Sequence, residues 1–81
     1  MTVDILFFGV LSELATSDRV HRDLPDGATL GAVRTLLESE FPAAAARLAS
    51  SGVAINQEWI DGDRVLVDGD EIAFLPPVSG G

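Results

Sequence analysis

The stretch Thr29-Leu-Gly-Ala-Val-Arg-Thr-Leu-Leu-Glu-Ser-Glu-Phe41 predicts the one main helix of this chain, and the fold class follows from it. Thr29 stands where a helix N-cap is expected. Apolar residues follow it at helical spacing as one stripe, made of Leu30, Val33, Leu37 and Phe41 and widened by Leu36. Pro42 then ends this helix and suits the first turn of a second, shorter helix over residues 43–49, with Gly52 as its stop.

Two segments before the helix have the character of strands. Residues 3–9 are apolar and do not alternate after Asp4, which predicts a strand covered on both faces. Residues 10–17 are expected to form a connector. One face is then expected to carry Val20, Arg22 and Leu24, and the other His21 and Asp23, which predicts a half-exposed edge strand with His21 on its solvent side. The tripeptide Pro25-Asp26-Gly27 is a turn signal that ends this strand.

Strands also follow the helix, over residues 53–56, 58–60 and 71–75, with a short apolar run over 65–67. Asp68-Gly69 is one hairpin-turn signal between the last two runs, and Asp61-Gly62-Asp63 is an equally good one. Strands on both sides of one helix in so short a chain predict an α+β fold. We expect a mixed sheet of four or five strands with the helix on one face, and the apolar first and last strands at its centre.

Composition narrows the possible functions. The chain has 81 residues, enough for one domain, and five basic against thirteen acidic residues give a net charge of −8. This charge disfavours binding to nucleic acid or anionic membranes and favours a partner with a basic groove. Cys and Lys are absent and there is one His, which argues against disulfides, thiol or Schiff-base chemistry and a zinc site. No leader or membrane-spanning run is apparent, so we expect a cytoplasmic protein without a conventional active site.

The last residues, Pro76-Pro77-Val78-Ser79-Gly80-Gly81, have a different character from the rest. Two prolines cannot continue a sheet interior, so we expect a domain over residues 1–75 and a flexible extended tail over 76–81. Six residues at ~3.3 Å each reach about 20 Å, enough to enter a partner's cleft. The terminal carboxylate becomes reactive only once it is activated, for instance as an acyl-adenylate. It can then accept an amine, as in protein conjugation, or sulfur, giving a thiocarboxylate.

The chain resembles the β-grasp, ubiquitin-like sulfur carriers, and within them the small subunits of molybdopterin synthases. The resemblance covers essentially the whole chain. It is carried by Leu6-Phe7-Phe8-Gly9, by Val53-Ala-Ile-Asn56-Gln57 and above all by the fourteen residues from Asp68 to Gly81. The family fold implies that Asn56-Gln57 turns a short hairpin and that Asp68-Gly69-Asp70 leads into the last strand.

The resemblance also implies a function. Gly81, next to Gly80, would be adenylated by an ATP-dependent adenylyltransferase of the ubiquitin-activating type and converted to a thiocarboxylate. An upstream donor would supply the sulfur. The tail would insert into the large subunit of molybdopterin synthase, a heterotetramer, and give sulfur to cyclic pyranopterin monophosphate; two rounds would complete the dithiolene. The chain would bind no cofactor and would not be a catalyst alone, because the activating partner uses the ATP and Mg.

Partner contacts are expected from the end of the last strand and the tail, at Leu75, Pro76, Pro77, Val78 and Ser79. Leu75 departs from the common family pattern, in which an aromatic residue is frequent. Which of Phe7, Phe8, Phe74 and Leu75 face the partner is left open by the sequence. Trp59 is expected to pack locally, and His21 is not expected to take part in chemistry.

Two alternatives remain open at this point. The same sulfur chemistry could serve thiamine, cysteine or tRNA thiolation. The chain could instead be a ubiquitin-like modifier or a plain binding module with an inert tail.

Overall fold

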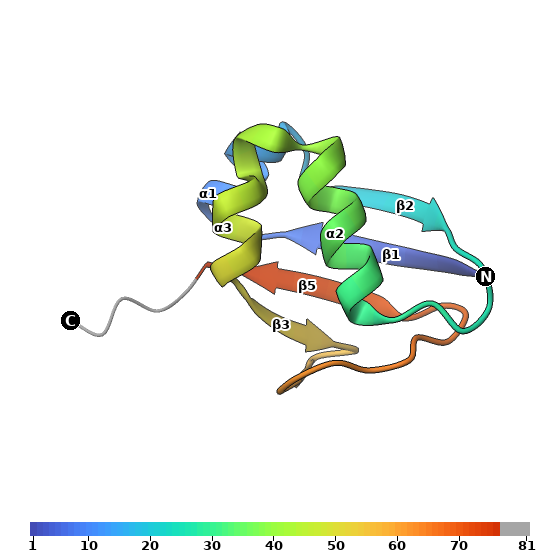
Figure 1. Cartoon of the computed structure of the whole chain (residues 1–81). Coiled ribbons are helices and arrows are strands. Elements are labelled where there is room, and N and C mark those ends of the chain that lie inside the picture. The colour runs from blue at the N-terminus through green and yellow to red at the C-terminus, as the bar shows by residue number, and fades with distance from the viewer. Residues whose placement is uncertain (77–81) are drawn as a thin grey trace.

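The structure, a computed structural model, describes residues 1–76. Its elements follow the order β1 (Thr2–Phe7), α1 (Val10–Ala15), β2 (Arg19–Asp23), α2 (Leu30–Glu40), η1 (Pro42–Ala44), α3 (Ala45–Ser50), β3 (Gly52–Ile55), β4 (Glu58–Trp59) and β5 (Glu71–Leu75). The strands form one mixed sheet in the order β2-β1-β5-β3-β4, and α2 and α3 lie across one of its faces (Figure 1). The predicted α+β architecture, with the first and last strands at the centre, is confirmed.

The register of the sheet and the alternation along each strand explain which residues face the helices. Strand β1 runs parallel to β5 and antiparallel to β2, and β3 runs antiparallel to both β4 and β5. Alternate residues of the central strands are buried under the helices, and they supply seven of the fifteen residues of one core cluster. Its aromatic centre is Phe7, which stacks on Phe74 with centroids 6.4 Å apart and meets Phe41 edge-on at 5.6 Å. Burial and contact of these rings stabilise the packing of the sheet against α2.

Helix α2 begins as the sequence predicts, because the Thr29 side chain accepts a hydrogen bond from the amide of Ala32 at 3.2 Å. A second acceptor comes from a distant loop: Asp63 Oδ1 accepts from the amide of Gly31 at 2.8 Å. Leu30, Val33 and Leu37 are buried as predicted, whereas Leu36 points to solvent and does not widen the stripe.

The predicted stop of the short helix at Gly52 is wrong. Helix α3 ends at Ser50, Ser51 is already extended, and Gly52 is the first residue of β3. The Arg34 guanidinium replaces a glycine cap: its Nη1 donates to the carbonyls of Leu48 and Ser51 and to the Ser51 hydroxyl. A side-chain donor that satisfies the last carbonyls of a helix makes a left-handed glycine unnecessary.

Two other segments differ from their prediction. Residues 10–17, expected as a connector, contain α1, whose Leu11 and Ala15 are buried at helical spacing. Residues 65–67 form no ladder, although Val65 makes an isolated bridge to Thr29. Leu66 donates its amide to the carbonyl of Ala28 at 2.9 Å, so this run follows the entry to α2 and only Leu66 is buried.

The structure shows which of the turn signals forms a hairpin. Asn56 and Gln57 turn the β3–β4 hairpin with φ of 52° and 70°, as the resemblance implied. Asp68-Gly69-Asp70 leads into β5 and joins no two strands as a hairpin. Asp70 is buried there, accepting hydrogen bonds from the Asn56 side chain at 2.9 Å and the Val67 amide at 2.8 Å. Among the described residues, no helix is long and apolar enough to cross a membrane.

Candidate functional site

The sheet face opposite the helices is the first part of the candidate site. The sequence predicted that β1 is covered on both faces, and this is wrong: its residues alternate between buried and partly exposed. Directly paired residues of neighbouring strands point to the same side of a sheet. The pairing therefore places one row across the open face, consisting of Trp59, Ala54, Ala73, Leu6 and Arg19.

The open face changes character along the strands. Its row nearest the start of β5 is charged, because Glu71 pairs with Asp4 and Asp4 with His21. The Asp4 carboxylate contacts the His21 ring and lies 3.4 Å from Arg19 Nη1, so these charges are paired with one another. Toward the end of β5 the face becomes apolar. We call this apolar part, made of Leu6, Ala54, Trp59, Ala73 and Leu75, the exit patch.

Trp59 gives the exit patch its largest exposed surface, with 66% of the residue accessible. Its indole lies over Gly52, where an added Cβ would come within 2.7 Å of the ring atom Cζ3. Gly52 is also the register partner of Leu75, so Trp59 rests on the strand beside the end of β5. The local packing predicted for Trp59 is confirmed, and the structure adds that the ring remains open to solvent.

The orientation of the four residues that the sequence left open is now determined. Phe7 and Phe74 are buried in the core, at 3% and 0% exposure. Phe8 is 44% exposed, and its amide donates to the carbonyl of Phe74 at 3.2 Å, which places its backbone beside the end of β5. Leu75 is partly exposed and its partner Gly52 lies opposite it on the open face. Phe8 and Leu75 are therefore the two available for contact.

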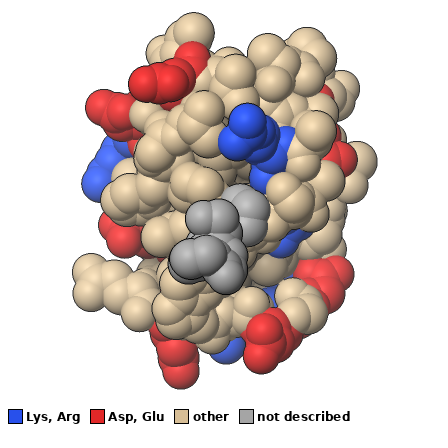
Figure 2. All heavy atoms as spheres, turned by 90° about the vertical axis from the view of Figure 1, so that its left-hand side faces the viewer, with Lys and Arg blue, Asp and Glu red and all other residues tan. Residues whose placement is uncertain are grey.

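The chain leaves the domain at Pro76, next to the exit patch. Figure 2 looks onto this end of the molecule: uncharged side chains surround much of the point of departure, and the acidic ones lie mostly toward the outline. Pro76 is the first residue of the predicted tail and the last residue that the structure describes. Pro77, Val78, Ser79, Gly80 and Gly81 lie outside the described residues, so the prediction that they contact a partner, and that Gly81 reacts, remains a prediction.

The titratable side chains of residues 1–76 form no metal centre. No group of three or more His, Asp or Glu side chains in that part of the chain could hold a metal ion. One carboxyl there has a clearly shifted pKa: the amides of Gly31 and then Arg64 donate to Asp63 and lower its pKa below its usual value of 3.8. Asp63 lies at the start of α2, at the other end of the sheet from Pro76, and its bonds fix a loop.

Sequence reasoning missed most of the exit patch. Leu6, Ala54 and Ala73 belong to three different strands, and only the sheet register brings them together. The signal that could have found them is the alternation within each strand, because Leu6, Ala54 and Ala73 each lie between two buried residues.

Comparison with known proteins gives an independent view of the whole chain. Residues 5–81 match the model of the ThiS family. A molybdopterin synthase sulfur carrier subunit from Dictyostelium discoideum is 39% identical over 80 residues, which cover 95% of this chain and 93% of the relative. The protein of that name from Escherichia coli is 36% identical over 83 residues, with 98% and 99% coverage.

Solved structures agree with these relatives. Subunit 1 in the complex of subunits 1 and 2 of molybdopterin-converting factor from Helicobacter pylori is similar to this chain, with a TM-score of 0.73, 32% identity and full coverage of both chains. SAMP1 from Haloferax volcanii has a TM-score of 0.86 at 30% identity, again with full coverage of both. The similarity therefore extends over the entire fold, including the strand that ends at the exit patch.

Proposed function

The chain belongs to the ThiS family, and on this basis we propose that it carries sulfur on Gly81 for molybdenum cofactor biosynthesis. The relatives named above and the subunit 1 structure support this client rather than thiamine, cysteine or tRNA thiolation, or protein modification. One observation carries the proposal within the structure itself: the apolar half of the open sheet face ends where the chain departs at Pro76. Docking of this face would place the residues beyond Pro76 at the partner's reaction site.

The chemistry requires activation of a carboxylate. In the first step, a carboxylate oxygen of Gly81 attacks the α-phosphorus of ATP, and pyrophosphate leaves. A hydrosulfide ion released by an upstream donor then attacks the acyl carbon and displaces AMP, and loss of its remaining proton gives the thiocarboxylate. An activating adenylyltransferase uses the ATP and Mg for this step, and the chain itself holds no cofactor.

Delivery of the sulfur needs a second partner. A complex with the large subunit of molybdopterin synthase is supported by the Helicobacter pylori complex. There the thiocarboxylate sulfur would attack a carbon of cyclic pyranopterin monophosphate, and water would then cleave the bond between that sulfur and the Gly81 acyl carbon, restoring the carboxylate. A second carrier would complete the dithiolene in the same way. We expect the chain to act as the sulfur-donating subunit and not as a catalyst alone. We expect this chemistry in the cytoplasm.

The exit patch is suited to both partners in turn. Its Trp59 and Leu75, together with the exposed Phe8 beside the end of β5, supply aromatic and aliphatic side chains of the kind that anchor protein interfaces. The net charge of −8 favours approach to partners with basic surfaces. Because one patch serves both docking events, the carrier must leave the activating enzyme before it binds the large subunit.

Intact mass spectrometry tests the proposal. The chain is incubated with an activating adenylyltransferase, ATP and a sulfide source, beside a matched chain that lacks Gly81. We expect a mass increase equal to one oxygen replaced by sulfur in the full chain and none in the deletion. The product should then convert cyclic pyranopterin monophosphate to the dithiolene when a large subunit is added.

Three outcomes would contradict the proposal. The absence of any mass change with several activating enzymes would exclude a sulfur carrier. A thiocarboxylate that forms but never reacts in the presence of the large subunit would point to another client pathway. Amide-linked conjugates to other proteins, formed in preference to the thiocarboxylate, would identify a modifier.

A further inference from the structure

A contact between Gly9 and Pro76 lies at the root of the tail. Gly9 connects β1 to α1 and adopts φ 58° and ψ −135°, a combination that residues with a side chain avoid. A Cβ added to Gly9 would lie 3.0 Å from Pro76 Cγ and 3.7 Å from Cδ. The proline ring is therefore seated against the bare backbone of Gly9, and even a methyl group there would push the ring away.

The parallel register explains why these two residues meet. Phe7 pairs with Phe74, and the Phe8 amide extends the pairing by donating to the Phe74 carbonyl. Strands that run side by side in the same direction end together, so the residues two positions further on, Gly9 and Pro76, become neighbours. Nothing in the local sequence of either segment predicts this contact.

Gly9 cannot easily retreat from Pro76. Its carbonyl accepts hydrogen bonds from the Ser12 amide at 3.1 Å and from the Ser12 hydroxyl at 2.8 Å. These bonds fix the first turn of α1, whose Leu11 is fully buried in the core. Because α1 fixes Gly9, we expect crowding between the two residues to displace Pro76.

We propose that Gly9 is a positioning residue: its missing side chain lets Pro76 seat against the β1–α1 turn, and this contact sets the direction in which the chain leaves the domain. The role rests on the proposed function, in which Gly81 must reach a partner's reaction site. A displaced Pro76 changes the direction in which the residues after it leave the domain, and therefore the region that Gly81 can reach. Misplacement of a reacting group by about 1 Å can lower a rate about 100-fold.

A double-mutant cycle tests the contact. The variants are Gly9→Ala, Pro76→Ala and the two combined, with Gly62→Ala as a matched control. Gly62 also has a positive φ, of 77°, but an added Cβ would meet nothing within 4 Å. For each variant, kcat and KM for thiocarboxylate formation are measured with the activating enzyme, and the folded fraction is measured by urea unfolding.

We expect Gly9→Ala to lower kcat roughly 10- to 100-fold. Its KM should hardly change, because docking uses the exit patch. In the Pro76→Ala background, the same change at Gly9 should alter kcat by no more than about twofold, the scatter expected of independent sites. Gly62→Ala should leave kcat unchanged. Equal losses from Gly9→Ala in both backgrounds would mean that backbone strain at Gly9 is responsible, and would overturn the proposal.

A second measurement separates this proposal from the proposed function. The chain has no Cys, so Ser79→Cys gives a single attachment point for a nitroxide spin label. Paramagnetic broadening of backbone amides then maps the region that the label visits, without any enzyme. We expect Gly9→Ala to change this map and Gly62→Ala to leave it unchanged. An unchanged map for Gly9→Ala would refute the positioning role, even if the wild-type chain carries sulfur. A changed map in a chain that never accepts sulfur would refute only the function.

Discussion

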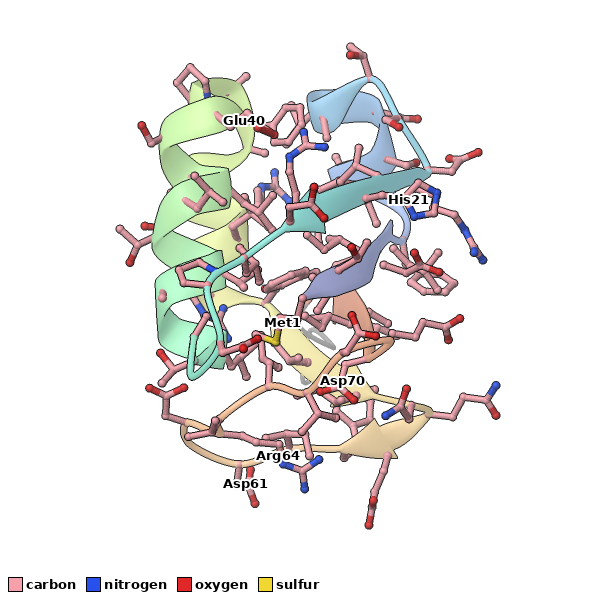
Figure 3. All side chains as sticks on the ribbon, turned by 90° about the vertical axis from the view of Figure 1, so that its right-hand side faces the viewer. Met1, His21, Glu40, Asp61, Arg64 and Asp70 are labelled. Carbon is pink, nitrogen blue, oxygen red and sulfur yellow. The ribbon has the colours of Figure 1, made fainter. Side chains whose placement is uncertain are left out.

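The two ends of strand β5 are built by opposite means. At its start, polar side chains tie the strand to its surroundings: Asp70 is buried between the Asn56 side chain and the Val67 amide, and Asp68 Oδ1 accepts from the Thr2 amide at 2.8 Å. Figure 3 views this end of the molecule, with Met1 and Asp70 labelled near the loops that the network joins. At its other end, glycines and apolar side chains surround the strand, and few polar bonds hold the chain.

The difference separates stability from function within one strand. The polar end closes the sheet and anchors the loop over residues 60–70 to the start of α2. The apolar end leaves backbone and aromatic surface available, with Gly52 under the indole of Trp59 and Gly9 against Pro76. Changes at the first end should therefore affect folding, and changes at the second should affect partner binding while the fold is retained.

The largest expected effect on stability is at the polar end. Asp70→Ala should lower the free energy of unfolding by about 2–3 kcal/mol, because the Val67 amide and the Asn56 side chain lose their acceptor in a buried site. Urea unfolding measures this, and the part of the sample that remains folded should still transfer sulfur at the normal rate. The matched control is Asp61→Ala, a change at an exposed carboxylate in the neighbouring loop. Similar losses from both changes would show that the buried network does not stabilise this end.

The apolar end should give the converse result. Trp59→Ala should weaken binding to the large subunit roughly tenfold or more, as expected of an aromatic anchor. Its stability should change by only about 0.5 kcal/mol, since the side chain is mostly exposed. Isothermal titration calorimetry and urea unfolding measure the two quantities.

Val67→Ala is the matched control for Trp59→Ala, because Val67 is an equally exposed apolar residue, at 62%, outside the exit patch. It should leave the affinity unchanged. If both variants bind as tightly as the wild type, the exit patch is not the docking surface.

The smallest effect is a dependence of stability on pH. The Gly31 and Arg64 amides hold the pKa of Asp63 below its usual value of 3.8. A carboxyl with a depressed pKa in the folded state contributes stability above its unfolded pKa, and this contribution disappears as the pH falls through the folded value. Urea unfolding of Asp63→Asn should therefore show a shallower loss of stability below pH 3.8 than the wild type. The control Asp61→Asn removes a carboxylate of the same loop that lacks these hydrogen bonds. If this control also loses stability less steeply at low pH than the wild type, the pH dependence does not come from Asp63.

Much of the fold could be predicted from local patterns. The Thr29 cap, the stripe of α2 and the edge strand β2 all depend on residues close together in sequence, where periodicity and capping preference act. The hairpin at Asn56 and Gln57 was implied by the family resemblance. The errors occurred where a distant group decided the outcome. Gly52 looked like a helix stop, but Arg34 satisfies the end of α3. Residues 65–67 looked like a strand, but their amides bond to Asp70 and to the entry of α2.

The candidate site divides in the same way. The sequence by itself predicts its chemical end, because Pro76-Pro77 cannot continue a sheet interior and Gly80-Gly81 carry no side chains. The absence of Cys and Lys and the strongly acidic net charge are also read directly from the sequence. Only the tertiary structure decided the surface that carries that segment. The exit patch joins residues from four strands, and Gly9 meets Pro76 from the other end of the chain, because strand register, which no local pattern encodes, brings them side by side.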